Sequence, residues 1–203
     1  MKLYYSPGAC SLAPHIVARE ASIAIDLVRV NLKSHKTANN DDFLKINPRG
    51  YVPALEISGE VHTEVSALVQ YIAEQGAPSP LLPSAGTRER FLVNQWLGFV
   101  SSELHKTLSP WLFDEEAADS TQQAVRAKVA TRLADIDAGL ASRAYLTGKN
   151  FTVADAYAFA VLSWSDFLKI DLKPYPNVRD YLARVAARPR VREALQAEGL
   201  VNT

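Results

Sequence analysis

The sequence of 203 residues contains only one cysteine, Cys10. A single thiol cannot form an intramolecular disulfide, and it excludes a structural zinc site built from cysteines. It also excludes a Cys-x-x-Cys redox pair, so a second thiol for redox chemistry must come from another molecule. The histidines do not offer a metal site either, because no two of them lie at a metal-ligand spacing, and no bound metal is expected; they are His15, His35, His62 and His105.

Charge of one sign and long apolar runs are missing as well. The chain carries 22 Lys and Arg residues against 22 Asp and Glu residues, so its formal net charge is zero. This balance provides no basic face for a phosphate backbone, and nucleic acid is not an expected partner. The apolar runs are shorter than the ~20 residues of a membrane span, and the N-terminus lacks the apolar stretch of a secretory signal. We therefore expect a cytoplasmic protein without a membrane span.

In the first 76 residues, the spacing of the apolar residues changes several times between the periods of a strand and a helix. Short β-branched or alternating runs predict strands at 2–5, 27–30, 53–57 and 60–62. Apolar residues at helical spacing predict helices at 11–21, 41–46 and 64–75. Strands that alternate with helices and then end in a hairpin are typical of a small α/β sheet of mixed direction. Residues 1–76 are therefore expected to form one α/β domain.

The remaining sequence is different in character. Residues 77–86 contain three prolines, which neither a helix nor a central strand tolerates, so this stretch is expected to be a linker. After it, helical periodicity continues to the end of the chain without alternating runs. Helices are expected at 87–108, 117–142, 153–169, 178–188 and 191–198. Residues 87–203 are therefore expected to form an all-helical domain.

Cys10 lies after the first strand and directly before a helix. Unpaired N–H groups and the positive end of the helix dipole would stabilise a thiolate there, which makes Cys10 a candidate nucleophile. The alternative is a buried, inert cysteine, which is common. Since the chain has no resolving thiol, reactive chemistry at Cys10 favours glutathione, the commonest soluble thiol of the cytoplasm, as its partner.

A proline at the start of a predicted strand is the second notable feature. Pro53 follows Val52 and removes one donor from the sheet. A cis Val52–Pro53 bond would turn the chain and expose the backbone that precedes it, whereas a trans bond would simply begin the strand. The residues alone leave both alternatives open and favour the trans bond.

Several motifs together resemble a known family. Cys10 at a helix start, Val52-Pro53 before a strand and Thr63-Glu64 at a helix start resemble a thioredoxin-fold, glutathione-binding domain. With the proline-rich linker and the helical region, the whole chain is similar to the cytosolic glutathione S-transferases. Within them it resembles the bacterial beta class, in which a cysteine replaces the usual tyrosine or serine. The motifs nearest to that class are MKLYYSPGACSL (1–12), SELHK (102–106) and FTVAD (151–155).

The resemblance implies a thioredoxin-like α/β N-terminal domain, an all-α C-terminal domain and glutathione as co-substrate. Glutathione would lie along the first domain, with its cysteinyl unit on the backbone of Val52, in a manner that requires cis Pro53. Its γ-glutamyl end would meet Glu64 and the backbone of Val65 at a helix N-terminus. Glu64 could equally be an acid that complements the helix dipole. His35 would stand near a carboxylate of glutathione.

The second domain is implied to approach the thiol through Ser102 and His105. These residues are three apart on one predicted helix and should share a face. A cationic or hydrogen-bonding His105 would lower the pKa of Cys10 or orient the sulfur of glutathione, so Cys10 and His105 are the predicted catalytic pair. Without the resemblance, a lone histidine on an amphipathic helix is more often packed or solvated.

Three positions depart from the class pattern and predict weaker glutathione binding. His35 stands where a lysine is usual, although Lys36 is adjacent. Val65 replaces the usual Gly or Ser, and Gly98 stands where Asn is frequent. We expect a Kd above ~10 µM, which corresponds to a binding free energy weaker than about −6.8 kcal/mol.

Three functions are compatible with these residues. The first is conjugation of glutathione to hydrophobic electrophiles by a homodimeric transferase, with Cys10 able to form a mixed disulfide with glutathione. The second uses the same site for thiol–disulfide exchange, peroxide reduction or dehalogenation, with Cys10 as nucleophile. The third is a non-catalytic protein that binds apolar ligands in a pocket lined by aromatic residues; the candidates are Tyr4, Phe99, Trp111, Phe113 and Trp164.

One motif is predicted to serve folding alone. Thr152 suits the N-cap of a helix, and Asp155 follows three residues later, so the two can form a capping box. Loss of this motif should destabilise the protein by about 0.5–2 kcal/mol.

Overall fold

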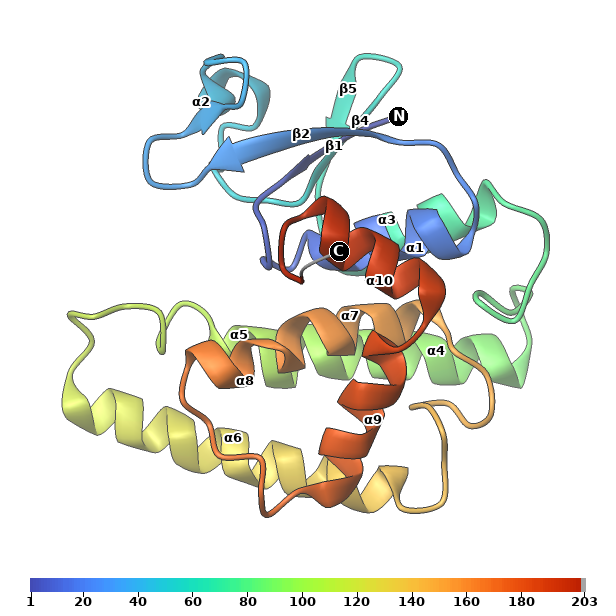
Figure 1. Ribbon diagram of the computed structural model, residues 1–203, viewed down its shortest axis with the longest axis vertical. Helices are drawn as coiled ribbons and strands as arrows, with labels where there is room; N and C mark the ends of the chain where they lie inside the picture. The colour runs from blue at the N-terminus through green and yellow to red at the C-terminus, as the bar shows by residue number, and fades with distance from the viewer. Residues whose placement is uncertain (202–203) are drawn as a thin grey trace.

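In the computed structural model, which describes residues 1–201, the N-terminal region forms a five-stranded sheet with helices packed against it (Figure 1). The strands are β1 (Lys2–Tyr5), β2 (Asp26–Asn31), β3 (Lys36–Thr37), β4 (Ala54–Ile57) and β5 (Glu60–His62). Their spatial order is β3-β2-β1-β4-β5. The β1–β2 pair is parallel and the other pairs are antiparallel, which confirms a sheet of mixed direction. Strand β3 was not predicted, because two residues are too few to show a period.

The alternation of side chains along β1 divides the core of this region in two. Leu3 points toward the helices α1 (Leu12–Glu20) and α3 (Val65–Glu74), which lie between the sheet and the rest of the molecule (Figure 1). Tyr4 points the other way and packs on Phe43 of α2 (Phe43–Ile46). The sheet therefore has one face against the large core and a second face covered by the loop that carries α2.

The C-terminal region is helical, as predicted. Its elements are α4 (Arg88–Phe99), the π-helical segment η1 (Val100–His105), α5 (Lys106–Leu108), α6 (Asp119–Leu140), α7 (Val153–Leu162), α8 (Trp164–Phe167), α9 (Pro176–Ala186) and α10 (Pro189–Ala197). Two predicted helices are more complex than expected. The helix at 87–108 changes to π-helical winding in its second half, and the helix at 153–169 is interrupted at Ser163.

Helix α7 is the centre of the molecule. Each of its residues is buried, because α1, α3, α4 and α9 all pack around it. Its N-terminus has the predicted capping box, in which Asp155 Oδ2 accepts hydrogen bonds of 2.9 Å from both the backbone N–H and the hydroxyl of Thr152. Asp155 Oδ1 also accepts from the backbone of Leu146 and from the hydroxyl of Tyr181. The motif therefore joins three segments as well as capping one helix.

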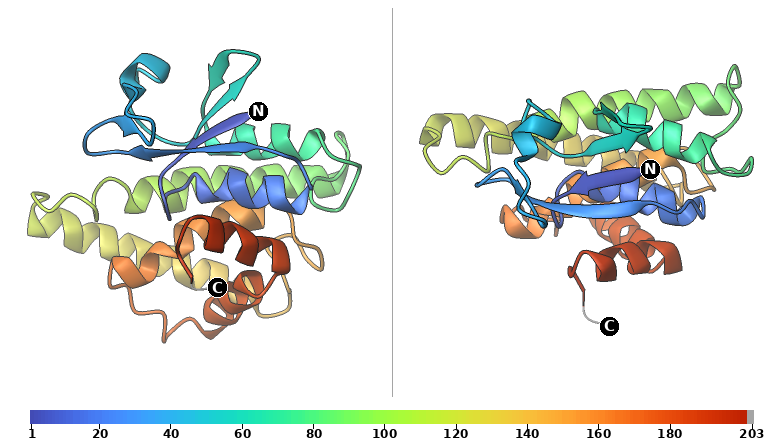
Figure 2. Two further views of the ribbon diagram at one scale, coloured as in Figure 1. Left: turned by 45° about the horizontal axis from the view of Figure 1, so that its top comes forward. Right: turned by 90° about the horizontal axis from the view of Figure 1, so that it is seen from above.

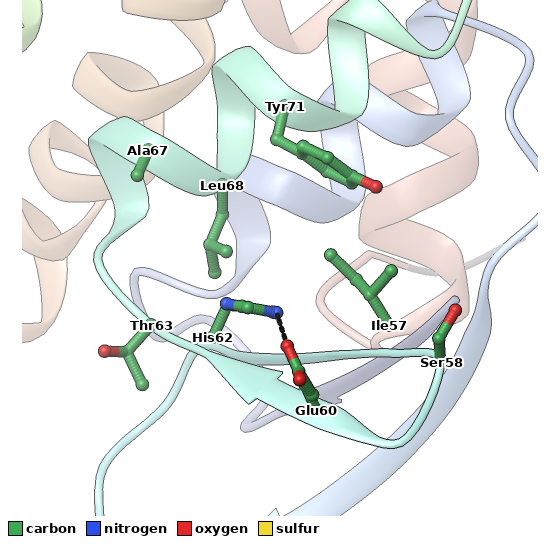
Figure 3. A pocket seen from close by; sticks show the side chains of 8 residues that line it. All are labelled: Ile57, Ser58, Glu60, His62, Thr63, Ala67, Leu68 and Tyr71. Atoms are coloured by element: carbon green, nitrogen blue, oxygen red, sulfur yellow. Dashed lines mark ion pairs between the residues drawn. The ribbon is translucent and has the colours of Figure 1, made fainter.

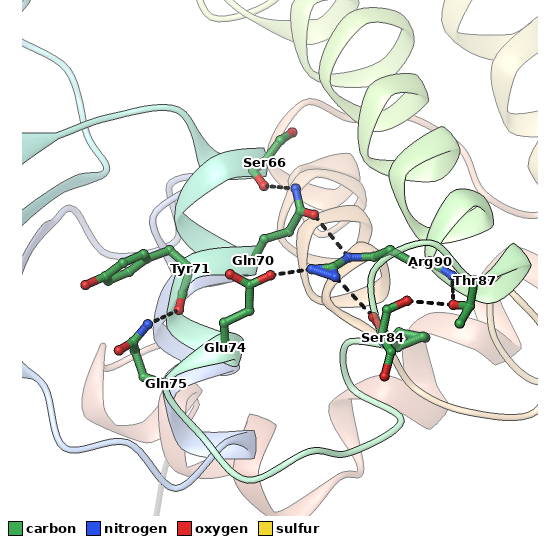
Figure 4. A network of polar contacts seen from close by, with 9 residues as sticks. Ser66, Gln70, Tyr71, Glu74, Gln75, Ser84, Thr87 and Arg90 are labelled. Atoms are coloured by element: carbon green, nitrogen blue, oxygen red, sulfur yellow. Dashed lines mark hydrogen bonds and ion pairs between the residues drawn. The ribbon is translucent and has the colours of Figure 1, made fainter.

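Partly buried polar contacts tie the two regions together near the linker. Residues 77–86 contain neither helix nor strand, and Arg90 at the start of α4 reaches across them (Figure 4). Its guanidinium donates to the Pro83 carbonyl at 3.1 Å, to the Gln70 side chain at 3.4 Å and to Glu74. Because Gln70 and Glu74 belong to α3, this one side chain joins α3, the linker and α4.

The last helix returns to the N-terminal region. Helix α10 packs beside α1 (Figure 2), and Glu198 just beyond it accepts from the backbone of Gly8 at 3.0 Å. The same carboxylate pairs with Nδ1 of His15 at 2.9 Å, and both side chains are fully buried. The loop that precedes Cys10 is thus held by the C-terminal end of the chain. No helix within residues 1–201 is long and apolar enough to cross a membrane.

Candidate functional site

Cys10 lies in the loop between β1 and α1, and its side chain is buried against the Val52–Pro53 turn. The thiol Sγ donates to the carbonyl oxygen of Val52 at 3.3 Å. The Val52–Pro53 peptide bond is cis, as the resemblance implies and contrary to what the residues alone favour. The structure therefore brings three predicted site residues together, although Cys10 and Val52 are 42 positions apart in the sequence.

Two opposing influences act on the pKa of Cys10. Burial raises this pKa from 9.0 to about 12. The backbone N–H groups of Cys10 and Ser11 and the charge of Lys106 act in the opposite direction but are weaker than the loss of solvation. The helix start therefore acts in the predicted direction and burial outweighs it here. Activation of Cys10 in catalysis stays a prediction.

The backbone around Val52 is suited to pair with an extended peptide. The N–H of Val52 has no acceptor among residues 1–201, and its carbonyl is occupied only by the Cys10 thiol. An extended peptide that lies beside a strand end gains hydrogen bonds from groups of this kind. Val52 as a whole is buried.

The start of α3 presents further unpaired donors. Within the part of the chain that the structure describes, the N–H groups of Val65 and Ser66 have no acceptor. Glu64 precedes them in a left-handed conformation with φ of +73°, which is costly for a residue with a side chain. Its exposed carboxylate makes no capping bond and instead accepts from the Tyr51 hydroxyl at 3.0 Å, with Arg49 at 3.9 Å. Sequence analysis missed both of these partners.

His105 lies at the end of η1 and is enclosed by aromatic residues. Its Nδ1 is 2.6 Å from the hydroxyl oxygen of Tyr157 in α7. The ring of Trp164 meets it edge-on, with ring centres 5.1 Å apart. Burial lowers the pKa of His105 from 6.5 to about 4, with a smaller contribution from the charge of Lys106. This lowered pKa favours a neutral imidazole at pH 7 and therefore the hydrogen-bonding role over the cationic one.

Ser102 and His105 do not share surroundings as predicted. Ser102 is exposed, donates to the carbonyl of Gly98 at 3.0 Å, and lines a groove with Ser66 and Gln70 of α3. His105 packs instead against Tyr157. The reason is the π-helical winding of η1, in which hydrogen bonds run from i to i+5 and residues three apart no longer stack. The side of Gly98 is open, so an asparagine side chain would have room there.

His35 lies in the loop before β3. It has a left-handed φ of +49°, and its ring lies against Gly50, where an added Cβ would come within 3.0 Å of the imidazole. Its Nδ1 is buried with no hydrogen-bond partner among residues 1–201. The adjacent Lys36 is exposed. The contribution of His35 to glutathione binding stays a prediction.

The aromatic residues predicted to line an apolar pocket separate into groups. Phe113 meets Trp164 edge-on at 5.2 Å between ring centres and stacks on Phe167 at 5.8 Å. This cluster adjoins His105 through Trp164. Tyr4 lies instead on the far face of the sheet and Phe99 packs on Trp96, while Trp111 is 47% exposed. Phe167, which is 75% exposed, was not among the predicted residues.

Tyr157 and Lys106 are the site residues that sequence analysis did not assign. A phenol in the otherwise apolar run 156–162 of α7 was the available signal for Tyr157. A negative charge on Cys10 raises the pKa of Tyr157, so the two side chains lie within electrostatic reach of each other. The charges of Lys106 and Glu64 act on both Cys10 and His105. These residues therefore form one electrostatic environment between α1, α3, η1 and α7.

A second groove lies between the β4–β5 hairpin and α3 (Figure 3). Its floor is apolar, with Ile57, Leu68 and Tyr71, and Glu60 and His62 pair across its rim at 3.8 Å. None of the predicted site residues lines it. Over residues 1–201, no group of three or more His, Cys, Asp or Glu side chains could hold a metal ion.

Comparison with known proteins adds independent findings. Residues 8–75 match the family model for the glutathione S-transferase N-terminal domain, and residues 99–189 match the model for the C-terminal domain. Glutathione S-transferase GstA of Escherichia coli O157:H7 is 38% identical over 201 residues, which cover 98% of this chain and 100% of that protein.

Two solved structures extend the comparison. A bacterial beta class glutathione S-transferase from Sphingomonas chungbukensis has a TM-score of 0.94 and 44% identity, with coverage of 99% of this chain and 100% of that one. A sphingomonad glutathione S-transferase complexed with glutathione has a TM-score of 0.93 and 42% identity over the same shares of the two chains.

Proposed function

The chain belongs to the glutathione S-transferase family, and we propose that it conjugates glutathione to hydrophobic electrophiles at the site around Cys10 and His105. The predicted family, beta class and fold are confirmed, and glutathione is the co-substrate. The roles of the individual residues, the electrophile pocket and the dimer are parts of the proposal.

One observation carries the placement of glutathione. The unpaired N–H of Val52 lies beside Cys10, and the unpaired N–H groups of Val65 and Ser66 stand at the start of α3. The first can donate to the cysteinyl unit of the tripeptide, and the other two can donate to the carboxylate of its γ-glutamyl end. Glu64, whose carboxylate is exposed, can meet the amino group of that same end. The tripeptide would then lie with its sulfur near Cys10.

Cys10 acts in this proposal as a hydrogen-bond donor to the sulfur of glutathione. Its thiol is neutral and now donates to the carbonyl of Val52. When the cysteinyl N–H of glutathione pairs with that carbonyl, the thiol becomes available to the incoming sulfur. A donor there stabilises the glutathione thiolate and lowers its pKa. The raised pKa of Cys10 argues against its service as the nucleophile in the redox alternative.

In the transfer step, the glutathione sulfur attacks an electrophilic carbon. A carbon–sulfur bond forms, the bond to the leaving group breaks with its electron pair, and the thiol proton has passed to solvent beforehand. The cluster of Phe113, Trp164 and Phe167 offers the electrophile an apolar surface beside His105. Positioning of two reactants in this way supplies much of the acceleration that such enzymes need.

Conjugation of glutathione to 1-chloro-2,4-dinitrobenzene, followed by absorbance, tests the function. We expect a glutathione-dependent rate in the wild type and at least a tenth of that rate in Cys10→Ser, because the hydroxyl still donates a hydrogen bond. Cys10→Ala, the matched control, should be slower than Cys10→Ser.

The same variants separate the redox alternative from transfer. Exchange between glutathione and hydroxyethyl disulfide would require the thiol of Cys10, so a wild-type exchange rate that Cys10→Ser abolishes would support that alternative. A wild type with no glutathione-dependent rate toward any of a panel of electrophiles would contradict transfer and favour a non-catalytic binding protein.

A homodimer and a cytoplasmic location also belong to this proposal. The neighbouring helices α3 and α4 expose Tyr71 by 37% and Phe91 by 65%, which are large apolar side chains to leave in water. A second copy of the chain that covers them, with its helical domain against the first domain, would bury both. Sedimentation analysis should give a mass of about twice 22.3 kDa, and a monomer at micromolar concentration would contradict the dimer.

A further inference from the structure

Tyr157 has a buried hydroxyl whose partners lead directly to the site. It lies in α7 and is 2% exposed, so its hydroxyl has no access to bulk water. A buried phenol needs hydrogen-bond partners inside the protein. Its hydrogen-bond partner within residues 1–201 is Nδ1 of His105, at 2.6 Å. His105 belongs to η1, the π-helical segment of the second region.

The direction of this hydrogen bond follows from the partners available to the phenol. Burial raises the pKa of Tyr157 far above its ordinary value, so the phenol keeps its proton. Among residues 1–201, the acceptor for that hydrogen is Nδ1 of His105. A neutral imidazole carries a single ring proton. Nδ1 accepts the hydrogen bond from Tyr157, so it cannot carry that proton. The proton of His105 therefore lies on Nε2.

The orientation of the imidazole is restrained from two sides. The rings of Tyr157 and Trp164 both meet His105 edge-on, at interplanar angles of 88° and 72°. Trp164 is itself anchored, because its indole Nε1 donates to the carbonyl of Gly8 at 2.8 Å, in the loop that leads to Cys10. A ring held in this way cannot exchange its two nitrogens by a flip without loss of these contacts.

We propose that Tyr157 is a positioning residue that holds the proton of His105 on Nε2 and thereby makes the imidazole a fixed N–H donor toward the sulfur of bound glutathione. The inference rests on the proposed function, since it assigns His105 a task in the glutathione site. It adds a residue from α7 to that site and explains why a neutral histidine, rather than a cationic one, is sufficient there.

The tautomer can be observed directly and without any substrate. Long-range proton–nitrogen NMR spectra of the ¹⁵N-labelled wild type at pH 7 should show His105 with a protonated Nε2, with the assignment made from the signals missing in His105→Gln. Tyr157→Phe should shift His105 toward a mixture of the two tautomers. Tyr181→Phe is the matched control, because it removes another buried hydroxyl, bonded to Asp155, and should leave the His105 signals unchanged.

Kinetics with the same variants test the consequence. Tyr157→Phe should lower kcat roughly tenfold and change the KM for glutathione by less than about twofold, on the scale of one lost hydrogen bond. His105→Gln places an amide N–H near the position of Nε2 and should keep more activity than His105→Asn. In the His105→Gln background, Tyr157→Phe should have little further effect, because the proton it positions is gone.

Failures of the two proposals look different. A wild type that shows the Nε2 tautomer but no glutathione-dependent rate would overturn the proposed function and leave the placement of the proton intact. A wild type with normal transfer, in which His105 carries its proton on Nδ1 or Tyr157→Phe leaves the spectrum unchanged, would overturn the role of Tyr157. Equal losses from Tyr157→Phe in the wild-type and His105→Gln backgrounds would also overturn it, since they indicate a structural effect.

Discussion

The two regions that meet at the site contribute different kinds of chemical group. Residues 1–76 offer backbone N–H groups at Val52, Val65 and Ser66, whose positions follow from a turn and a helix start. The helical region offers the side chains of His105 and Tyr157, which hold each other in place. Backbone N–H groups remain after most substitutions, whereas a contact between two side chains is lost when either residue is replaced. The first half of the site should therefore tolerate sequence change better than the second.

Cys10 belongs to the first region, but its contribution depends on its side chain, as do the contributions of the second region. Its properties come from what packs on it rather than from its place before α1. The contribution of the helix start is present but smaller than the effect of burial. Three experiments test this contrast between backbone and side-chain contributions.

The largest expected effect concerns the reactivity of Cys10. Burial raises its pKa to about 12 and also blocks access, so alkylation by iodoacetamide at pH 7 should be more than about 100-fold slower in the native protein than in urea. Because the chain has a single thiol, mass spectrometry reads the rate without ambiguity. The urea-unfolded chain is the control and should react as an ordinary cysteine, with a midpoint near 8.5.

The pH profile of this reaction decides between the two interpretations of Cys10. A native midpoint above 8.5 agrees with burial as the controlling factor. A midpoint well below 8.5 would mean that the helix start prevails after all, and the first region would then supply an activated group rather than a scaffold.

A smaller effect is expected from the titration of His105. Its pKa is lowered from 6.5 to about 4, so the unfolded chain binds a proton more readily than the folded protein does. The free energy of unfolding should therefore fall as the pH decreases from about 6.5 to about 4. With allowance for partial exposure of the ring, the loss attributable to His105 is roughly 1–3 kcal/mol.

Urea unfolding at pH 7.5 and pH 4.5 measures this loss. The difference between the two pH values should shrink by about that amount in His105→Gln. His62→Gln is the control, because His62 lies on the exposed edge strand β5, and it should leave the difference unchanged. An identical pH dependence in His105→Gln and the wild type would show that burial of His105 does not govern its protonation.

The smallest effect concerns the strained backbone of Glu64. Glycine adopts a positive φ without steric cost, so Glu64→Gly should raise the free energy of unfolding by about 0.5–1 kcal/mol. The same change should weaken glutathione binding, because the carboxylate is lost. Glu64→Gln separates the two effects, since it keeps the strain and removes only the charge.

Urea unfolding and calorimetric titration with glutathione give both quantities. Equal losses of affinity in Glu64→Gly and Glu64→Gln would assign binding to the side-chain charge. Full affinity in both variants would assign the γ-glutamyl end to the backbone N–H groups alone and would make the contrast between the two regions sharper.

Local patterns predicted most of the fold because local physics decides them. Thr152 and Asp155 form their capping box from residues three apart, and the α3 boundaries differ from the prediction by one residue at each end. The two-residue strand β3 and the π-helical segment η1 were missed. Both depend on pairing or packing with distant residues and leave no periodic trace in the sequence.

The sequence predicted which residues come together at the site better than it predicted their pKa values and hydrogen-bond partners. Cys10, Val52 and Pro53 come together as expected, and Pro53 follows a cis bond. Burial outweighs the effect of the helix start on the pKa of Cys10, and His105 has a partner, Tyr157, that no motif predicted. Residue types and spacing describe which groups are available, whereas solvation and partners depend on the surrounding fold.

The sequence alone was enough to predict the family, the order of most helices and strands, and one thiol at the start of a helix, because these depend on short-range patterns and on residue identity. The tertiary structure was needed to show that this thiol is buried, that Ser102 and His105 face different neighbours, and that the imidazole of His105 contacts a tyrosine 52 positions away. The physical reason is that the pKa of a group and the direction of a hydrogen bond are set by burial and contact, and those arise from residues far apart in the chain.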